Sequence, residues 1–412
     1  LTCAKSINIK RKRCQRVSKT SILSALSQPA NSKINDDNQA SLYGAKEACR
    51  DVANEILANV KCDEIELLLF HTSTLFDLDT VAKEISARFP HVNIVGCTSA
   101  GEFNKNGYGT EKLLAVAFLK NEFSIATALV PNLGEVNFDE AHDIASGLRR
   151  ALQGRERRYD TEQHFVISVL DGLTRHEEHF LETFATAFGN IPHLGGSAGD
   201  DLKLEATYVF YNGEFHRDAA VLLLVGTGKP FTVFSIDHIN SPVSKLVVTH
   251  ADPESRTVYE INGEPAAQYY ASLLGMKAED LTPDVFSMFP LAVMVGGKYF
   301  IRSIQKVDLA TNAITFYCAV DIGIILTFVQ MGDCIEALES KLDKLRAQLG
   351  EPEFVYACDC FLRRLEIQQG KNDHEIRRLQ QMYNVAGFNA YGEHIHSVHL
   401  NQTFTGVYFA AQ

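Results

Sequence analysis

The sequence predicts an α/β and α+β protein in two parts: an internally duplicated α/β N-terminal half and a mixed-sheet C-terminal domain. Three observations carry this prediction. One glycine motif occurs twice, strand-like and helix-like stretches alternate up to about residue 228, and short alternating strands dominate afterwards. An internal repeat dictates how a fold is partitioned, and alternating strands and helices favour layered α/β architecture.

The repeated motif is a glycine turn with a carboxylate. Gly-Cys-Thr-Ser-Ala-Gly-Glu at residues 96–102 returns as Gly-Gly-Ser-Ala-Gly-Asp-Asp at residues 195–201. Each copy follows an apolar run, a helix-like stretch and a second short apolar run. We therefore expect two related sub-domains, at about 60–120 and 160–228.

The elements of the first half follow from periodicity and breakers. Helical spacing predicts helices over 38–60, 78–89 (ending before Pro90) and 176–188. Short apolar runs predict strands over 64–71, 91–96, 113–119, 165–170, 191–194 and 219–225. Both glycine turns fall at the carboxyl ends of strands, where ligands of α/β sheets bind.

The second half has a different texture. Strands are predicted over 230–236, 244–249, 257–261, 294–304, 313–317, 324–328, 354–358, 384–389 and 396–409. A turn leads into a helix over 262–274, the 333–349 segment is an amphipathic helix, and 376–383 is helical. The predicted domains are 39–228 and 229–412.

Charge and cysteine usage narrow the function classes. The net charge is -12, yet residues 1–35 hold eight Lys or Arg and no acid. The acidic body excludes a basic nucleic-acid groove, and residues 1–38 are expected to be a basic, disordered extension outside the fold. No apolar run is long enough for membrane insertion. Nine scattered cysteines suit free thiols in a reducing cytoplasm.

The two turns are the first candidate site. Their glycines permit close backbone approach, and successive amides can form an anion-binding nest. Their serines can hydrogen-bond a polar ligand, while their acids can take an amine or a cation. The alternative is that both are tight turns that only join strands. The candidate small-ligand residues are Ser99, Gly101, Glu102, Ser197, Gly199 and Asp200.

Histidines supply further candidates. The run His-Glu-Glu-His at 176–179 is expected to be a solvated helical face. His394 and His396 should share one face of a strand and His399 the other, so one axial ligand is more plausible than a cluster of three. A polar strand edge is the alternative.

Two thiols lie close together in the sequence. Cys358 and Cys360 precede Arg363 and Arg364, whose charge favours thiolate. The pair is interpreted either as a redox couple or as buried free cysteines at a strand end.

Several pieces, taken in order from about residue 40 to the end, resemble the FIST family of bacterial sensory proteins. They are the two glycine turns, Asn212-Gly213 followed by residues 218–223, Ile-Asn-Gly-Glu-Pro-Ala at 261–266, Cys-Asp-Cys-Phe-Leu-Arg-Arg at 358–364, Gly387-Phe388 and Tyr-Gly-Glu at 391–393. The ending His-Leu-Asn-Gln-Thr-Phe-Thr-Gly-Val at 399–407 looks most like the NosP branch.

That resemblance implies a cytoplasmic, non-enzymatic nitric oxide sensor that binds haem b non-covalently. It would regulate a partner histidine kinase in two-component and cyclic-di-GMP signalling that controls biofilms. Haem iron would be the only metal, held by one neutral imidazole in an apolar pocket. The candidate ligands, in order, are His399, His238 and His216. Whether the chain forms a homo-oligomer is left open.

Three other interpretations stand beside it. A small polar ligand such as an amino acid would lie between Ser99, Glu102, Ser197 and Asp200, whose carboxylates suit an ammonium and repel haem propionates. Haem would then sit in or beside the C-terminal domain. A redox enzyme would use Cys358 and Cys360, and an adaptor without ligand would act through helix 333–349.

Overall fold

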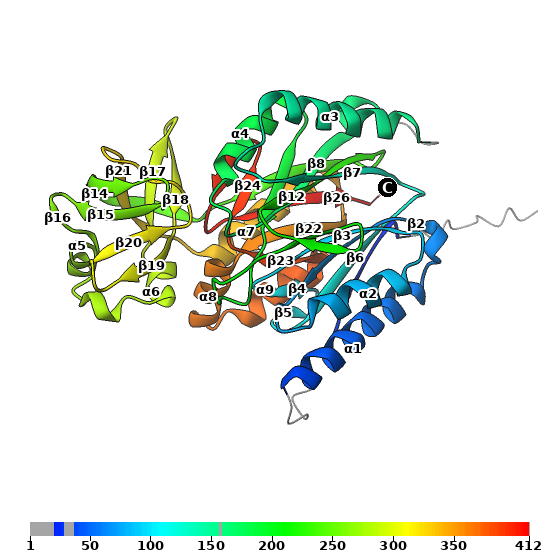
Figure 1. Cartoon of the computed structure of the whole chain (residues 1–412), viewed down its shortest axis with the longest axis horizontal. Coiled ribbons are helices and arrows are strands. Elements are labelled where there is room, and N and C mark those ends of the chain that lie inside the picture. Colours follow the sequence, from blue (N-terminus) through cyan, green and yellow to red (C-terminus); the bar gives the residue numbers. More distant parts are fainter. Residues whose placement is uncertain (1–19, 29–36, 156–158, 412) are drawn as a thin grey trace, which may run out of the picture.

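Three copies of one α/β unit follow one another along the chain, and an inserted domain interrupts the third (Figure 1). This arrangement comes from a computed structural model, which describes residues 20–28, 37–155 and 159–411. The sequence prediction of mixed α/β architecture in two parts is confirmed. The predicted duplication is a triplication.

The first unit contains β1 (Ile22–Leu26), α1 (Asp37–Leu57), β2 (Ile65–Thr72), α2 (Leu78–Arg88), β3 (Asn93–Thr98), β4 (Glu102–Asn104), β5 (Gly107–Gly109) and β6 (Leu113–Leu119). Its own strands pair in the order β1-β6-β2-β3, where β2 and β3 are parallel and the other pairs antiparallel.

The second unit repeats this order. It contains β7 (Phe123–Pro131), α3 (Phe138–Gln153), β8 (His164–Leu170), α4 (Glu177–Phe188), β9 (His193–Ser197), β10 (Val209–Tyr211), β11 (Glu214–His216) and β12 (Ala219–Thr227). Its strands pair as β7-β12-β8-β9, with β8 and β9 parallel.

The third unit is split by the insertion. It contains β13 (Phe231–Ile236), α7 (Cys334–Leu349), β22 (Pro352–Cys360), α8 (Phe361–Gln369), α9 (Asp373–Met382), β23 (Val385–Ala390), β24 (Glu393–Ile395), β25 (Val398–Leu400) and β26 (Phe404–Ala410). Its strands pair as β13-β26-β22-β23, with β22 and β23 parallel.

The inserted domain has its own sheet and core, and Figure 1 shows it to one side of the three units. It contains β14 (Ile239–Asp252), β15 (Thr257–Ile261), β16 (Glu264–Pro265), α5 (Ala266–Leu273), α6 (Pro283–Met288), β17 (Leu291–Val295), β18 (Lys298–Arg302), β19 (Ile304–Asp308), β20 (Ala313–Phe316) and β21 (Ile325–Met331).

Each unit gives a hairpin to another unit. The β4–β5 hairpin of the first unit extends the third sheet next to β23. The β24–β25 hairpin of the third unit extends the second sheet next to β9. The β10–β11 hairpin of the second unit extends the first sheet next to β3. The exchange is therefore cyclic.

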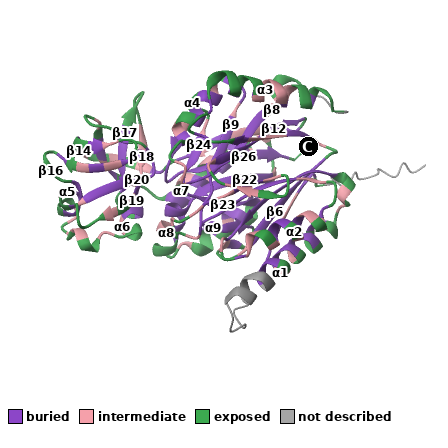
Figure 2. Cartoon of the chain, in the orientation of Figure 1, coloured by how far each residue is buried: buried purple, intermediate pink, exposed green. Residues whose placement is uncertain are grey.

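The three sheets share one central core, and helices cover the outer face of each sheet. Apolar side chains from all three sheets meet in this core, whereas α1 and α2, α3 and α4, and α7 with α9 pack on the outside. Figure 2 shows buried strands inside and exposed helix faces outside. Strands buried on both faces read as continuous apolar runs, as residues 67–70 do.

Local sequence sets where helices begin. Asp77 accepts a hydrogen bond from the Thr80 amide (2.8 Å) at the start of α2, and Asn137 accepts one from Glu140 (3.0 Å) before α3. The Asp333 carboxylate caps α7 in the same way. Such caps satisfy amide groups that have no partner within the helix.

Three sequence predictions need correction. Residues 22–26 form β1, so the fold begins before the predicted boundary at residue 38; residues 1–19 and 29–36 lie outside the described residues. The segment 294–304 is a hairpin and part of a third strand rather than one strand. The segment 396–409 is broken after β25, because residues 401–403 interrupt it. Within the described ranges, no helix is long and apolar enough to cross a membrane.

Candidate functional site

The two predicted glycine turns lie in contact, and a third turn from β23 joins them. The amide of Gly199 donates to the carbonyl of Thr98 (3.1 Å). The amide of Ala100 donates to Asn389 (3.0 Å), and the amide of Ser197 donates to Gly392 (2.8 Å). We call this meeting point the three-turn junction. Its amides bond to the other turns, so the predicted anion-binding nest is filled by the chain itself.

The glycines of the two turns serve this packing rather than an open ligand site. Gly101 has a φ of 142°, which favours glycine, and its carbonyl accepts a hydrogen bond from the Asn389 amide (2.7 Å). A Cβ on Gly101 would lie 2.0 Å from Arg364 Nη1, and one on Gly199 would lie 2.5 Å from the Ala100 nitrogen. The close backbone approach expected for a ligand at Gly101 and Gly199 is therefore made by the chain's own turns and by Arg364.

One carboxyl group of the junction is deeply buried. Glu102 is fully buried, and the hydroxyl of Ser99 bonds its Oε1, while Oε2 has no partner among the described residues. Burial raises the pKa of Glu102 well above its usual value. Arg364 holds the turns together, because its Nη1 donates to the Ala100 carbonyl (2.6 Å) and to Asn389 Oδ1 (3.1 Å).

The other carboxylate organises the chain that follows it. Asp200 accepts hydrogen bonds from the amides of Leu204 (2.9 Å), Glu205 (2.6 Å) and Ala206 (3.0 Å). It also accepts one from the Tyr391 hydroxyl. Ser197 nearby is buried, and its hydroxyl has no partner in the described part of the chain. Asp200 therefore shapes the 204–206 loop.

That loop forms one wall of a cleft between the second unit and the inserted domain. The cleft has a volume of about 240 Å³. Its lining comes from the segment after β8, the 204–205 loop, the residue after β11, the residue before β15, and strands β19 and β20 with the residue after β20. It includes Gly172, Leu173, Arg175, Leu204, Glu205, Arg217, Arg256, Gln305, Lys306, Thr315, Phe316 and Tyr317. Tyr317 contacts Tyr391 of the junction, with ring centroids 5.8 Å apart. We call this the cation-lined cleft.

Positive charge dominates the cleft. Four cationic side chains line it, against the single carboxylate of Glu205. Arg256 is buried and paired with Glu177 (2.7 Å) and Glu178. Arg175, Arg217 and Lys306 line the cleft without a salt bridge to any residue that the structure describes, and the Arg217 guanidinium lies over the Tyr208 ring, 5.9 Å from its centroid.

The run at 176–179 is not the solvated helical face that was expected. Glu177 is buried, and with Glu178 it binds Arg256 of the inserted domain. Glu178 also accepts a hydrogen bond from the Ala319 amide (3.1 Å). The start of α4 is therefore a contact between the second unit and the inserted domain. No signal in one sequence connects positions 177 and 256.

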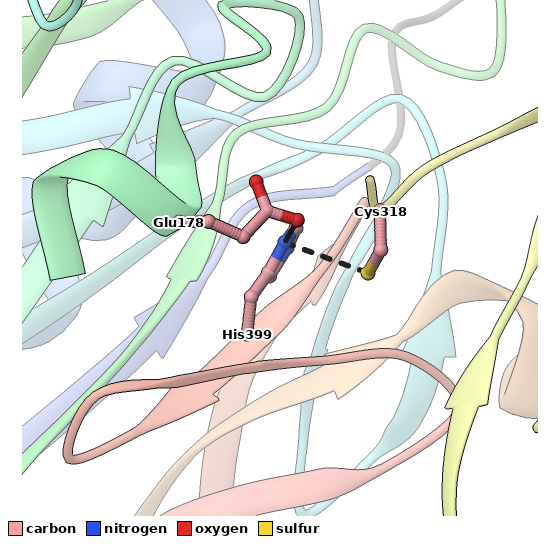
Figure 3. A group of neighbouring side chains, drawn as sticks. All are labelled: Glu178, Cys318 and His399. Carbon is pink, nitrogen blue, oxygen red and sulfur yellow. Dashed lines mark hydrogen bonds and ion pairs between the residues drawn. The ribbon is translucent and has the colours of Figure 1, made fainter. Parts of the chain in front are cut away.

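The three ranked histidines lie in separate places. His399 on β25 is buried, and its Nδ1 lies 3.2 Å from Glu178 Oε1 (Figure 3). His238 is buried after β13, where Glu366 and Arg363 contact its two ring nitrogens. His216 is half-buried at the end of β11, 3.4 Å from the Tyr211 carbonyl. His394 and His399 are cross-strand partners in the β24–β25 hairpin, which a single-strand prediction missed.

None of these histidines fits a haem in this arrangement. The Nε2 of His399 has no partner among the described residues, which suits an axial ligand. However, a Cβ on Gly392 would lie 2.3 Å from that nitrogen, so the backbone of the third turn occupies the place of a macrocycle. Both nitrogens of His238 are engaged, and His216 borders none of the cavities described here.

The two thiols are enclosed by the fold. Cys358 and Cys360 are fully buried, and burial raises the pKa of each thiol well above its usual value. The neighbouring arginines face other partners, because Arg363 Nε donates to Asp359 (2.9 Å). This setting opposes the thiolate that a redox couple needs.

These features define a class: three concatenated α/β units that enclose a turn junction, with an inserted domain closing a charged cleft. In comparisons with known families, residues 66–264 match the FIST N domain and residues 266–396 match the FIST C domain. The chain belongs to the FIST family of sensory proteins in signal transduction.

Individual relatives add little. The uncharacterized protein MJ1623 of Methanocaldococcus jannaschii is 24% identical over 398 residues, covering 87% of this chain and 76% of that protein. A cyanuric acid hydrolase structure aligns with 94% of this chain and 99% of its own at 10% identity and a TM-score of 0.33. The enzyme from A. caulinodans covers 50% and 71%, at 8% identity and a TM-score of 0.31. Likeness at that level carries no argument.

Proposed function

We propose that the chain is a sensory protein whose signal is a small anionic molecule, such as an amino acid or another carboxylate, bound in the cation-lined cleft. The observation that carries the proposal is three cationic side chains without salt-bridge partners in the described chain, Arg175, Arg217 and Lys306, around one cavity. A cleft lined by one sign of charge concentrates ligands of the opposite sign.

The contents of the cleft favour a small polar ligand over an apolar one. Gln305 and Thr315 add hydrogen-bonding groups, and Glu205 offers a carboxylate that suits an ammonium. An amino acid would place its carboxylate among the cations and its ammonium at Glu205. The sequence predicted a ligand at Glu102 and Asp200, but other groups of the chain hydrogen-bond both side chains. We therefore place the ligand in the neighbouring cavity.

The position of the cleft suggests how a signal is passed on. One wall belongs to the second unit and the other to the inserted domain. A ligand that binds both walls favours whichever arrangement of the two parts brings its partners together. We predict that a partner sensor histidine kinase responds to this change of arrangement. We also predict that the chain itself has no enzymatic activity.

Calorimetry on the full chain tests the proposal, with glutamate, succinate and inorganic phosphate as probes. At least one probe should bind and raise the melting temperature. Lys306→Gln or Arg217→Gln should weaken it about tenfold, the loss of one charge-assisted hydrogen bond. Lys344→Gln on the exposed face of α7 is the matched control. If Lys306→Gln and Lys344→Gln bind the probe with equal affinity, or if no probe binds, the proposed anion site is wrong.

Haem-based nitric oxide sensing stays a second prediction. The feature in its favour is the buried His399, with Nδ1 near Glu178 and Nε2 unpartnered in the described chain. An absorption spectrum of the reduced chain supplied with haem, before and after nitric oxide, tests it. A Soret band that shifts with nitric oxide and disappears in His399→Ala would require the third turn to move. Its absence would leave the cleft as the sensing site.

A further inference from the structure

Three potential metal ligands from three parts of the chain meet beside the cation-lined cleft (Figure 3). Glu178 lies in the first turn of α4, Cys318 follows β20 of the inserted domain, and His399 lies on β25. Cys318 and His399 are buried, while 36% of the Glu178 side chain is exposed. The site is therefore enclosed by protein and open on the carboxylate side.

Two of the three separations between donor atoms match a tetrahedral site, and all three donor atoms lie within 4.8 Å of one another. His399 Nδ1 lies 3.5 Å from Cys318 Sγ and 3.2 Å from Glu178 Oε1. Ordinary bond lengths to zinc place a nitrogen about 3.6 Å from a sulfur and about 3.4 Å from an oxygen when the ligands are tetrahedral. Each observed separation is within about 0.2 Å of the value expected for two ligands on one ion.

A catalytic relay does not explain this geometry. In a Cys-His-Glu triad the two ring nitrogens face different partners, one the thiol and the other the carboxylate. Here the same nitrogen faces both, and it can donate only one proton. The thiol is 3.0 Å from Asn401 Oδ1, which gives its proton a separate acceptor.

We propose that Glu178, Cys318 and His399 bind one Zn²⁺. Thiolate, imidazole and carboxylate are the three protein ligands that zinc takes, and the fourth position falls to a water molecule. Zinc binds thiolate and neutral imidazole, so binding displaces protons and the affinity falls as pH falls. This inference does not depend on the proposed anion site.

Local charge supports a cation despite the nearby arginine. Arg256 Nη2 contacts Glu178 and lies 2.7 Å from the buried Glu177. Two carboxylates and a metal-bound thiolate therefore face one guanidinium, which leaves two negative charges for a divalent ion. Glu178 Oε1, the oxygen nearest His399, is held by the Ala319 amide, which orients it toward the site.

A second cluster provides an internal comparison. His238, Cys334 and Glu366 also bring their ligand atoms together. There, however, Glu366 contacts His238 Nε2 at 2.8 Å and Arg363 Nη1 lies 3.1 Å from His238 Nδ1. A guanidinium donates only, so Nδ1 is the acceptor and Nε2 carries the proton. Neither nitrogen is free for a metal.

The test uses the full chain, stripped with a chelator and titrated with Co²⁺, followed by competition with Zn²⁺. The expected result is one ion per chain and a sulfur-to-cobalt charge-transfer band that Zn²⁺ removes. Cys318→Ser should abolish the band and weaken Zn²⁺ binding at least tenfold. Cys334→Ser is the matched control and should keep both.

Three outcomes of this titration would contradict the proposed Zn²⁺ site. No charge-transfer band in the unaltered chain would overturn the proposal without reference to any variant. A band that persists in Cys318→Ser, or that is lost in Cys334→Ser, would overturn it too. Circular dichroism of each variant shows that a lost band reflects a lost ligand rather than unfolding. His399→Asn, which keeps a polar side chain, should weaken Zn²⁺ binding comparably.

Discussion

Gly96, Gly195 and Gly387 occupy the same place in their units, where two parallel strands pass most closely. A Cβ on each would lie 2.4, 1.9 and 1.7 Å from a carbonyl oxygen of the neighbouring strand. These glycines are needed for backbone approach, which explains why each precedes its turn.

Replacing one of them should destabilise the fold. We expect Gly195→Ala to lower the free energy of unfolding by about 3 kcal/mol, because backbone atoms must separate to admit the methyl group. Gly147→Ala in α3 is the control: its Cβ meets only the end of Arg150, at 4.0 Å, and alanine favours helix. Chemical denaturation measures both. Equal stability of the two variants would contradict the close-approach argument.

His71 is a second residue whose environment has a measurable consequence. It is fully buried, stacks on Phe388 and contacts the Tyr356 hydroxyl (3.0 Å). Burial lowers the pKa of His71 to about 3. The unfolded chain binds a proton below about pH 6.5, whereas the folded chain does not until about pH 3.

Stability should therefore fall as pH drops through that window. For His71 alone the loss between pH 7 and pH 5 is about 2 kcal/mol. The buried His193, whose pKa burial also lowers to about 3, adds to it. Denaturation at both pH values checks this. His71→Gln should show a smaller drop than the unaltered chain, and an identical drop would mean that His71 is protonated in the fold.

At the scale of elements, the turn after β9 depends on one carboxylate. Asp200 accepts from three successive amides of the 204–206 loop and from Tyr391 of the third unit. The side chain therefore fixes both the cleft wall and the junction.

Asp200→Ala should cost about 3 kcal/mol of unfolding free energy, because several buried donors lose their acceptor. Hydrogen exchange at residues 204–206 should rise in the same variant. Asp308→Ala, which removes an exposed acceptor of the Ala310 amide, should cost much less. Unchanged exchange in Asp200→Ala would mean that the loop is held by other contacts.

Sequence patterns predicted some elements well and others poorly. The runs 64–71, 165–170 and 219–225 are confirmed as strands, because burial on both faces leaves a long apolar signature. The third turn was missed because Asn-Ala-Tyr-Gly-Glu at 389–393 lacks the Ser-Ala pair. The strands of the exchanged hairpins have only three residues each, which is too short to show the two-residue alternation of a strand, so the sequence did not predict these hairpins.

The candidate site was predicted in outline only. Ser99, Glu102, Ser197 and Asp200 do lie together, as two turns at strand ends imply. The cleft beside them could not be predicted, because an insertion far along the chain contributes its other wall. Long-range pairing of charges leaves no local pattern.

At the scale of the whole molecule, the inserted domain leaves and rejoins the third unit at one point. Ile239 pairs with Met331, and the Gly332 amide donates to the His238 carbonyl (2.7 Å). Its own core is separate from that of the units. A short linker should therefore be able to join the two ends of the third unit in place of the inserted domain.

Replacing residues 239–331 with such a linker should leave the three units folded, with a cooperative transition by circular dichroism. The same variant should lose both anion and Zn²⁺ binding, because Arg256, Lys306 and Cys318 leave with the insertion. Retained binding of either ligand would place its site elsewhere. An unfolded product would mean that the insertion is part of the cooperative unit.

The cyclic exchange of hairpins also affects how the chain is made. The second sheet is complete only when β24 pairs with β9, and about 200 residues separate these strands in the sequence. At ordinary rates of translation β9 waits about 10–40 s for its partner. During synthesis its unpaired edge is open to other chains, so the nascent protein depends on late C-terminal residues to close a sheet begun much earlier.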